Sequence, residues 1–190
     1  MNECVGIVVD GEGDYASLKR RFQRGYKVLK TDGPRGHTAP PDEIARKSRK
    51  QIGILSAFRC KHAIVMLDFE ERPQNYDDFL RDLRRCFEAV GFPMPVSVAV
   101  PNRMIENWYL ADIEYLSQKK VFLRDRLSQK NYEGTNGKKE LKQCMKRGVS
   151  YSETKHGPEL FEVLRFRTAR RNSESFDDFC RILKMRDKAQ

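Results

Sequence analysis

Short apolar runs alternate with amphipathic stretches over the first 116 residues. Three runs rich in β-branched residues, Val5–Val9, Ala63–Leu67 and Val96–Val100, predict buried strands, and Tyr26–Leu29 predicts a weaker one. Between and after them, apolar residues recur at helical spacing within residues 15–24, 41–58, 77–90 and 104–116.

This regular alternation of strand and helix predicts an α/β fold. We expect a Rossmann-like parallel sheet of about four strands, flanked by helices on both faces and joined by right-handed crossovers. Ligands of such sheets bind beyond the carboxyl ends of the strands. The residues directly after each strand are therefore the first place to look for chemistry.

Residues 117–190 show no strand pattern and are mostly helical and basic. Pro158 is expected to start a short helix and Ser175 to cap the last one. The polar segment Asn131–Lys139 contains two glycines and is expected to be a mobile loop. We therefore divide the chain into an α/β domain, 1–116, and a helical basic extension, 117–190, packed on it. Trp108 is expected in the core.

Charge changes this picture by suggesting a partner. The chain of 190 residues has 37 Lys and Arg against 27 Asp and Glu, a net charge of +10. Residues 1–100 hold 17 basic and 14 acidic side chains, whereas residues 101–190 hold 20 and 13. A basic surface attracts phosphate backbones, so nucleic acid is the expected partner. The alternatives are a solvated surface without such a partner and an acidic membrane surface.

Two groups of side chains are candidates for contacting nucleic acid. The loop after the second strand carries Arg35, which could hold a phosphate with two hydrogen bonds, and His37. A cluster further along comprises Arg165, Arg167, Arg170 and Arg171. An exposed turn and a solvated helix end explain the two groups equally well.

Several classes of protein are not expected. No stretch approaches the roughly 20 apolar residues of a membrane span, and the first residues do not resemble a signal peptide. The five cysteines are scattered and form no CxxC pair, which favours reduced thiols and a cytoplasmic location over a disulfide framework or a zinc site.

Acidic residues gather where two predicted strands end. The first strand is followed by Asp10, Glu12 and Asp14, and the third by Asp68 and Glu70. The carboxyl ends of parallel strands lie on the same edge of a sheet, and converging carboxylates repel each other unless a hard cation such as Mg²⁺ or Mn²⁺ binds them. The alternative interpretation is that strand-end turns favour Asp and Gly for conformational reasons.

These residues resemble the TOPRIM domain, which topoisomerases, bacterial primases and OLD-type nucleases share. The family has a strand ending in an acid and Gly with a second acid about four positions on, which Asp10, Gly11 and Asp14 match. A later strand ends in Asp-x-Asp, which Asp68-Phe69-Glu70 matches. Asp10 stands where the family usually has Glu, and Glu70 where it usually has Asp, so oxygen ligands are kept.

A third segment, VPNRMIENWYLAD at 100–112, resembles small stand-alone TOPRIM-like proteins of bacterial defence loci. By this resemblance Glu106 is the third acid, with Asp112 a weaker candidate. OLD-type nucleases also use a lysine from their C-terminal part near the scissile phosphate, and Lys155 matches it by position.

The resemblance implies a metal-dependent endonuclease that hydrolyses phosphodiester bonds of DNA or RNA. Mg²⁺ or Mn²⁺ would be held by five acids: Asp10, Asp14, Asp68, Glu70 and Glu106. Asp10 would also act as general base, and Lys155 and Arg35 would offset charge on the phosphate. The resemblance further implies a role in bacterial anti-phage defence, an ABC-type or AAA ATPase partner and a homo-oligomer.

Two other functions fit the same residues. A TOPRIM-like module without catalysis would bind nucleic acid or dock on an ATPase, and its binding would persist in chelator without any cut product. A phosphoryl- or nucleotidyl-transfer enzyme would instead consume nucleoside triphosphates.

Overall fold

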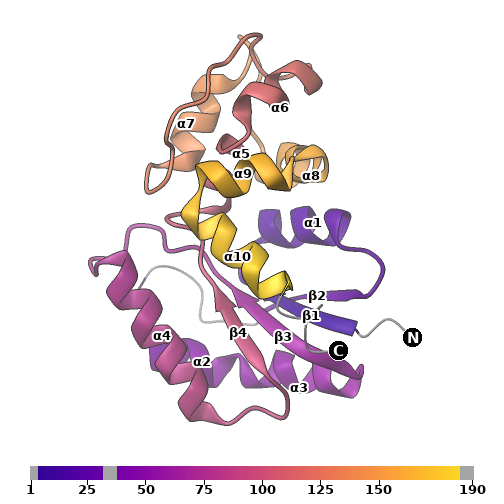
Figure 1. The fold of residues 1–190 in the computed structure, drawn as a ribbon, viewed down its shortest axis with the longest axis vertical. Coiled ribbons are helices and arrows are strands. Elements are labelled where there is room, and N and C mark those ends of the chain that lie inside the picture. Colours follow the sequence, from indigo (N-terminus) through magenta and orange to yellow (C-terminus); the bar gives the residue numbers. More distant parts are fainter. Residues whose placement is uncertain (1–3, 32–37, 185–190) are drawn as a thin grey trace.

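The computed structural model describes residues 4–31 and 38–184 and confirms the expected α/β architecture. Within these residues four strands form one parallel sheet in the order β2-β1-β3-β4 (Figure 1). The strands are β1 (Cys4–Val9), β2 (Tyr26–Lys30), β3 (Cys60–Met66) and β4 (Val96–Ala99).

Helices cover both faces of this sheet, so its strands are apolar on both sides. Alternate residues of β1 point to opposite faces: Val5, Ile7 and Val9 belong to one core and Val8 to the other. The helices of the first part are α1 (Glu12–Arg21), α2 (Pro41–Lys47), α3 (Arg49–Ala57) and α4 (Tyr76–Val90). In Figure 1, α2, α3 and α4 lie on one side of the sheet and α1 on the other.

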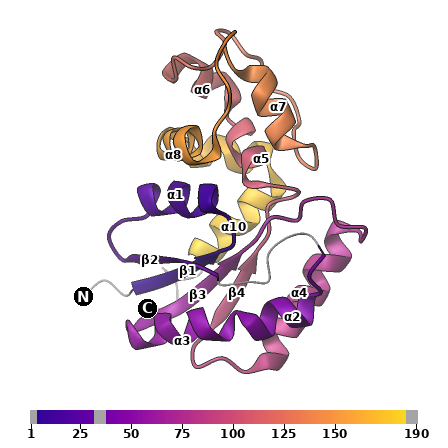
Figure 2. The ribbon, with the colours of Figure 1, turned by 180° about the vertical axis from the view of Figure 1, so that it is seen from behind.

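The rest of the chain is helical, as expected. Its helices are α5 (Ile105–Leu110), α6 (Ile113–Lys119), α7 (Gly137–Cys144), α8 (Glu153–Val163), α9 (Phe166–Asn172) and α10 (Glu174–Lys184). Both views show α6 and α7 at the end of the molecule furthest from the sheet, while α8 lies beside α1 and α10 returns to the sheet (Figures 1 and 2). No helix of the described residues is long and apolar enough to cross a membrane.

One aromatic cluster joins the two parts of the chain. Trp108 is fully buried, as expected, and its ring stacks on that of Phe179 with centroids 4.9 Å apart. Phe161 and Phe176 complete the cluster, which is continuous with Val5 and Ile7 of β1. The helices between residues 117 and 184 therefore share a hydrophobic core with the sheet.

Two helices expected to be continuous are interrupted. The single helix expected over residues 104–116 divides into α5 and α6 around Asp112, whose buried carboxylate accepts hydrogen bonds from the backbone and guanidinium of Arg165. The helix expected over residues 41–58 divides into α2 and α3 at Ser48, whose hydroxyl donates to the Ile44 carbonyl at 2.8 Å. Both breaks depend on contacts that periodicity does not reveal.

Two boundaries in the second part also differ from expectation. Helix α8 begins at Glu153 and carries Pro158 inside it, rather than starting there. Helix α7 begins at Gly137, within the segment expected to be a loop, because the Asn136 side chain accepts from the backbone of Lys139 at 3.0 Å. The preceding turn is held by the Asn107 amide, which donates to the carbonyls of Tyr132 and Thr135.

Candidate active site at the strand ends

The connections between strands single out one edge of the sheet. After β1 the chain moves outward to β2 on one side, and then crosses back to β3 on the other side of β1. In sheets of this kind ligands bind at the point where the strand order reverses, beyond the carboxyl ends of the strands. Asp10 follows β1 and Asp68 follows β3, so both acids lie at this point.

The first two acids are placed by the turn from β1 into α1. Asp10 follows the last residue of β1 and is partly exposed, and Gly11 precedes the first residue of α1. Asp14 lies in the first turn of α1 and is 5% exposed. A carboxylate in the first turn interacts favourably with the helix dipole, but this one is also withdrawn from water.

The acids after β3 are held by contacts with the segment that leads into α5. Asp68 is buried, and its Oδ1 accepts a hydrogen bond from the Ile105 backbone at 3.0 Å. Glu70 has a φ of 55°, in the left-handed region, and its N–H donates to the Arg103 carbonyl at 2.6 Å.

Glu106 is the most deeply buried of the five acids, with 1% of its surface exposed. Its Oε1 accepts a hydrogen bond from the Tyr151 hydroxyl at 3.0 Å, whereas its buried Oε2 has no hydrogen-bond partner. A buried polar atom without a partner is costly, so this oxygen is available to a ligand.

Lys138, at the start of α7, is the lysine that the structure brings to these acids. Its ammonium pairs with Glu153 at 2.9 Å. Partial burial acts to lower the pKa of Lys138, but the hydrogen bond to Glu153 and the charges of Glu106 and Asp68 outweigh it and raise the pKa. Sequence reasoning missed this residue, although Asn136-Gly137 before two lysines is a helix start.

Two glycines allow the helices to approach closely enough for this arrangement. A Cβ at Gly137 would lie 2.9 Å from the backbone nitrogen of Asn107, so only glycine lets α7 begin against α5. A Cβ at Gly13 would lie 2.8 Å from the Cβ of Glu153, where α1 meets α8.

The charges of the acids act on one another. Burial raises the pKa of Asp10 to about 6, with a further contribution from Glu70. Burial raises the pKa of Asp14 well above its ordinary value, and the charges of Asp10 and Glu106 add to the rise. The pKa of Asp68 is raised in the same way, by burial first and then by Asp14, Glu106 and Asp10. The five acids that the sequence singled out therefore lie close enough for the charge of each to act on at least one other.

A buried arginine accompanies these acids on the other side of the strand ends. Arg72 donates to the Ala39 carbonyl at 2.8 Å, and its guanidinium lies 4.3 Å from the ring centre of Phe79. Its charge acts on Asp10, whose pKa it lowers, and the charges of Glu70 and Asp10 act on Arg72 in turn. Sequence reasoning gave no signal for it.

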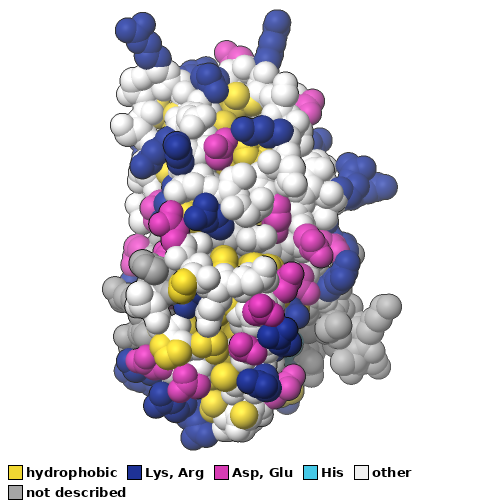
Figure 3. Space-filling view, turned by 90° about the vertical axis from the view of Figure 1, so that its left-hand side faces the viewer, with side chains coloured by type: hydrophobic (Ala, Val, Ile, Leu, Met, Phe, Trp, Pro, Cys, Tyr) yellow, Lys and Arg dark blue, Asp and Glu magenta, His cyan; other side chains and the backbone are white. Residues whose placement is uncertain are grey.

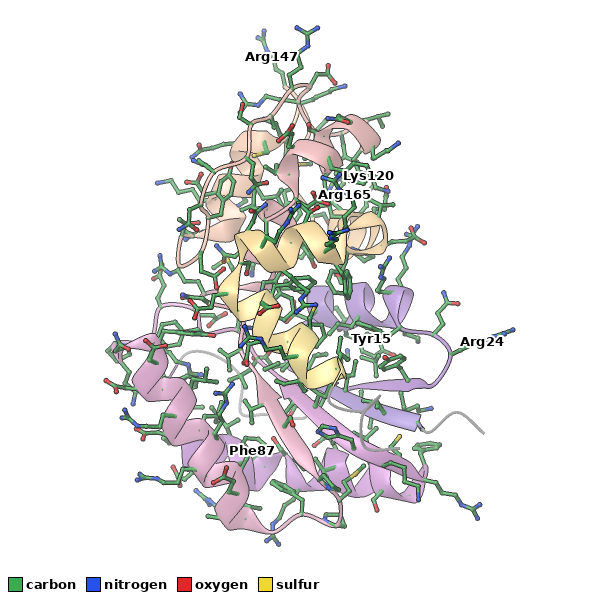
Figure 4. All side chains as sticks on the ribbon, in the orientation of Figure 1. Tyr15, Arg24, Phe87, Lys120, Arg147 and Arg165 are labelled. Carbon is green, nitrogen blue, oxygen red and sulfur yellow. The ribbon has the colours of Figure 1, made fainter. Side chains whose placement is uncertain are left out.

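The remaining candidates lie elsewhere or are already paired. Lys155 is exposed on α8. Arg165 is paired with Asp112 at 2.6 Å and Arg170 with Asp177 at 2.6 Å, whereas Arg167 and Arg171 are exposed on α9. Figure 4 shows Arg165 at the base of the helical end of the molecule. Arg35 and His37 lie outside the described residues.

The carboxylates suit a hard divalent cation, although they do not form a preformed coordination site. Carboxylate oxygens are the ligands that Mg²⁺ and Mn²⁺ prefer, and Glu106 Oε2 lacks a partner. Among residues 4–31 and 38–184, however, no three His, Cys, Asp or Glu side chains form a group that could hold a metal ion as they stand. Binding would require these side chains to move toward one another.

The comparison with protein families places the chain in one of them. A family model described as a domain of unknown function, DUF4276, matches residues 9–184. The chain belongs to the DUF4276 family. The match begins just before Asp10 and ends in α10, so it includes all five acids and Lys138. No curated protein and no solved structure matches the chain.

Proposed function

We propose that this DUF4276 protein is a metal-dependent nuclease of the TOPRIM type that hydrolyses phosphodiester bonds. One observation carries the proposal: acids from three separate segments meet at the point where the strand order of a parallel sheet reverses, and their charges raise one another's pKa. Keeping several carboxylates buried together destabilises a fold, which favours a functional reason for the cluster.

The cluster fits Mg²⁺ or Mn²⁺ by its chemistry. Asp10, Asp14, Asp68 and Glu106 would hold the cation, and Glu70 lies close enough to Asp10 for its charge to be felt there. When bound, the cation would supply positive charge and Lewis acidity to phosphate oxygens.

The other groups of the site have separate tasks. Asp10 is partly exposed and has a pKa of about 6, so near neutral pH it is a carboxylate able to take a proton from an attacking water. Lys138 carries a positive charge beside Glu106 and Asp68 and would balance negative charge on the phosphate. Tyr151 fixes the orientation of the Glu106 carboxylate.

The distribution of charge supports nucleic acid as the substrate. Residues 117–150 hold ten basic and three acidic side chains, so this segment alone accounts for the basic excess of the second half. Figure 3 shows Lys and Arg side chains projecting from the end of the molecule that α6 and α7 form. We call residues 117–150 the basic segment, and it also carries Lys138, so it leads from the surface to the acids.

The resemblance to TOPRIM proteins suggests the setting of this reaction. We place the protein in bacterial anti-phage defence in the cytoplasm, beside an ABC-type or AAA ATPase. The chain contains no Walker A motif of its own, so nucleotide hydrolysis would be the partner's task.

Matched substitutions test the proposal. Asp68→Asn removes a buried carboxylate with little change of shape, and Lys138→Met removes the ammonium; the controls Asp78→Asn and Lys47→Met change exposed residues of α4 and α2. With labelled DNA and RNA, single- and double-stranded, in Mg²⁺ or Mn²⁺, we expect Asp68→Asn to lose about 100-fold or more of the cleavage rate. Lys138→Met should lose at least about 10-fold, and both controls should cleave normally. Cleavage by Asp68→Asn at the parent's rate would contradict the assignment.

The described acids do not form a preformed coordination site, and this observation favours a second candidate function. If the described acids never close around a cation, the protein is a nucleic-acid-binding or ATPase-docking module. In that case binding to nucleic acid persists in chelator, and no cut product forms with Mg²⁺ or Mn²⁺ in the parent protein.

A further inference from the structure

Two cysteines meet at the amino ends of β1 and β3. The Sγ atoms of Cys4 and Cys60 are 2.6 Å apart, closer than two sulfur atoms that are not bonded normally approach. The two residues are direct partners across the parallel strands. Neighbouring strands lie about 4.8 Å apart, within the range of about 4.4 to 6.8 Å that Cα atoms take in disulfides.

A local irregularity turns both side chains to the same face of the sheet. The register between β1 and β3 shifts between Cys4 and Val5, because Cys4 pairs with Cys60 whereas Val5 pairs with His62. Both cysteines belong to the core under α3. Cys60 is buried, whereas Cys4 is partly exposed and within reach of reagents in solution.

We propose that Cys4 and Cys60 form a reversible disulfide with a disulfide oxidant such as oxidised glutathione. The Cys4 thiolate attacks glutathione disulfide, forming a mixed disulfide and releasing one glutathione thiolate. The Cys60 thiolate then attacks Cys4 Sγ and releases the second. Two electrons pass from the cysteine pair to glutathione, and the two thiol protons go to the released thiolates.

This site is separate from the acids. Cys4 begins β1, whereas Asp10 follows its end, so the two lie about 20 Å apart along the strand. The bond would fasten the first described residue of the chain to the central strand β3. It would close a loop between residues 56 positions apart, which restricts the unfolded chain and stabilises the fold. The inference therefore does not depend on the proposed nuclease activity.

Peptide mapping of the full chain tests the inference. After reduction and then exposure to oxidised glutathione, we expect a mass lower by two hydrogen atoms and a cross-linked peptide pair containing Cys4 and Cys60. After unfolding in denaturant, a maleimide should then label three of the five cysteines. Oxidation should raise the Tm by about 5 °C and leave any cleavage activity unchanged.

Substitutions complete the test. Cys4→Ser should abolish both the cross-link and the rise in Tm, whereas Cys86→Ser, a partly exposed cysteine on α4, should retain them. The proposal is overturned if all five thiols of the oxidised parent still react, or if the product is only a glutathione adduct. The cross-link in the parent protein can be read even if a variant fails to fold.

Discussion

At the scale of single residues, Glu106 shows how the site stores unfavourable energy. One carboxylate oxygen receives a hydrogen bond from Tyr151, and the other is buried without a partner. Burial raises the pKa of Glu106, and Lys138 and Tyr151 only partly counter this. The buried Glu106 carboxylate therefore destabilises the fold unless a cation binds beside it.

Replacing Glu106 separates its effect on stability from its role in binding a cation. In chelator we expect Glu106→Gln to raise the Tm by about 3 °C, because a neutral amide is less costly to bury than a carboxylate. Mn²⁺ should raise the Tm of the parent but not of this variant. Differential scanning fluorimetry provides the measurement, with Glu114→Gln, an exposed acid on α6, as control. An equal effect of Mn²⁺ on parent and Glu106→Gln would show that the cation binds elsewhere.

Asp10 provides a prediction about pH. Its folded-state pKa of about 6 exceeds its ordinary value, so its contribution to stability is present at low pH and is lost as the pH rises through about 6. In chelator, the free energy of unfolding of Asp10→Asn should exceed that of the parent by a difference that grows from about pH 4 to about pH 7. Urea titrations at several pH values measure this difference. A difference that stays constant between about pH 4 and about pH 7 would refute the raised pKa of Asp10.

At the scale of elements, the alternation of apolar runs and helical stretches predicted the strands and their parallel direction, but not the interruptions within helices. Runs such as Val5–Val9 are buried on both faces and were found where expected. The break at Asp112 was not, since it depends on Arg165, 53 residues away in the chain. Asp10, Asp14, Asp68 and Glu70 could be found from the strand ends, and Glu106 from the resemblance. Lys138 could not be found in either way, because it belongs to the separate helix α7.

The break at Asp112 can be tested by stability. This carboxylate is 1% exposed and accepts hydrogen bonds from the backbone and side chain of Arg165. We expect Asp112→Ala to lower the free energy of unfolding by about 2 kcal/mol, because the Arg165 groups lose their acceptor. Asp125→Ala, whose exposed carboxylate pairs with Lys146, should change it by less than about 0.5 kcal/mol. Urea denaturation of both variants measures these differences. Equal small losses would show that the Asp112 contact does not hold the break between α5 and α6.

At the scale of the whole molecule, most of the excess positive charge lies at the end furthest from the sheet. The basic segment carries most of the excess positive charge and ends in a tip at which Arg147 projects (Figure 4). Long-range attraction of a polyanion to this end would present the phosphate backbone to the side of the molecule from which Lys138 enters the site.

Neutralising this end should weaken binding in a way that depends on salt. Replacing four exposed residues of the basic segment with glutamine, Arg124, Lys139, Lys142 and Arg147, should reduce affinity for nucleic acid and lower the salt slope by up to about four units. The matched control replaces four exposed residues of α2 and α4: Arg46, Lys47, Arg81 and Arg85. Equal losses in both variants, measured by fluorescence anisotropy, would mean that net charge alone decides the affinity.

The order of these groups along the chain has a consequence for synthesis of the protein. Lys138, Tyr151 and α10, which completes the aromatic cluster, all follow the sheet in the sequence. The ribosome makes the sheet and its acids first, but the groups that hold Glu106 and cover the core are translated afterwards. A nascent chain thus carries the carboxylates without the pocket that organises them. Under the function proposed above, cleavage would begin only when almost the entire polypeptide has left the ribosome.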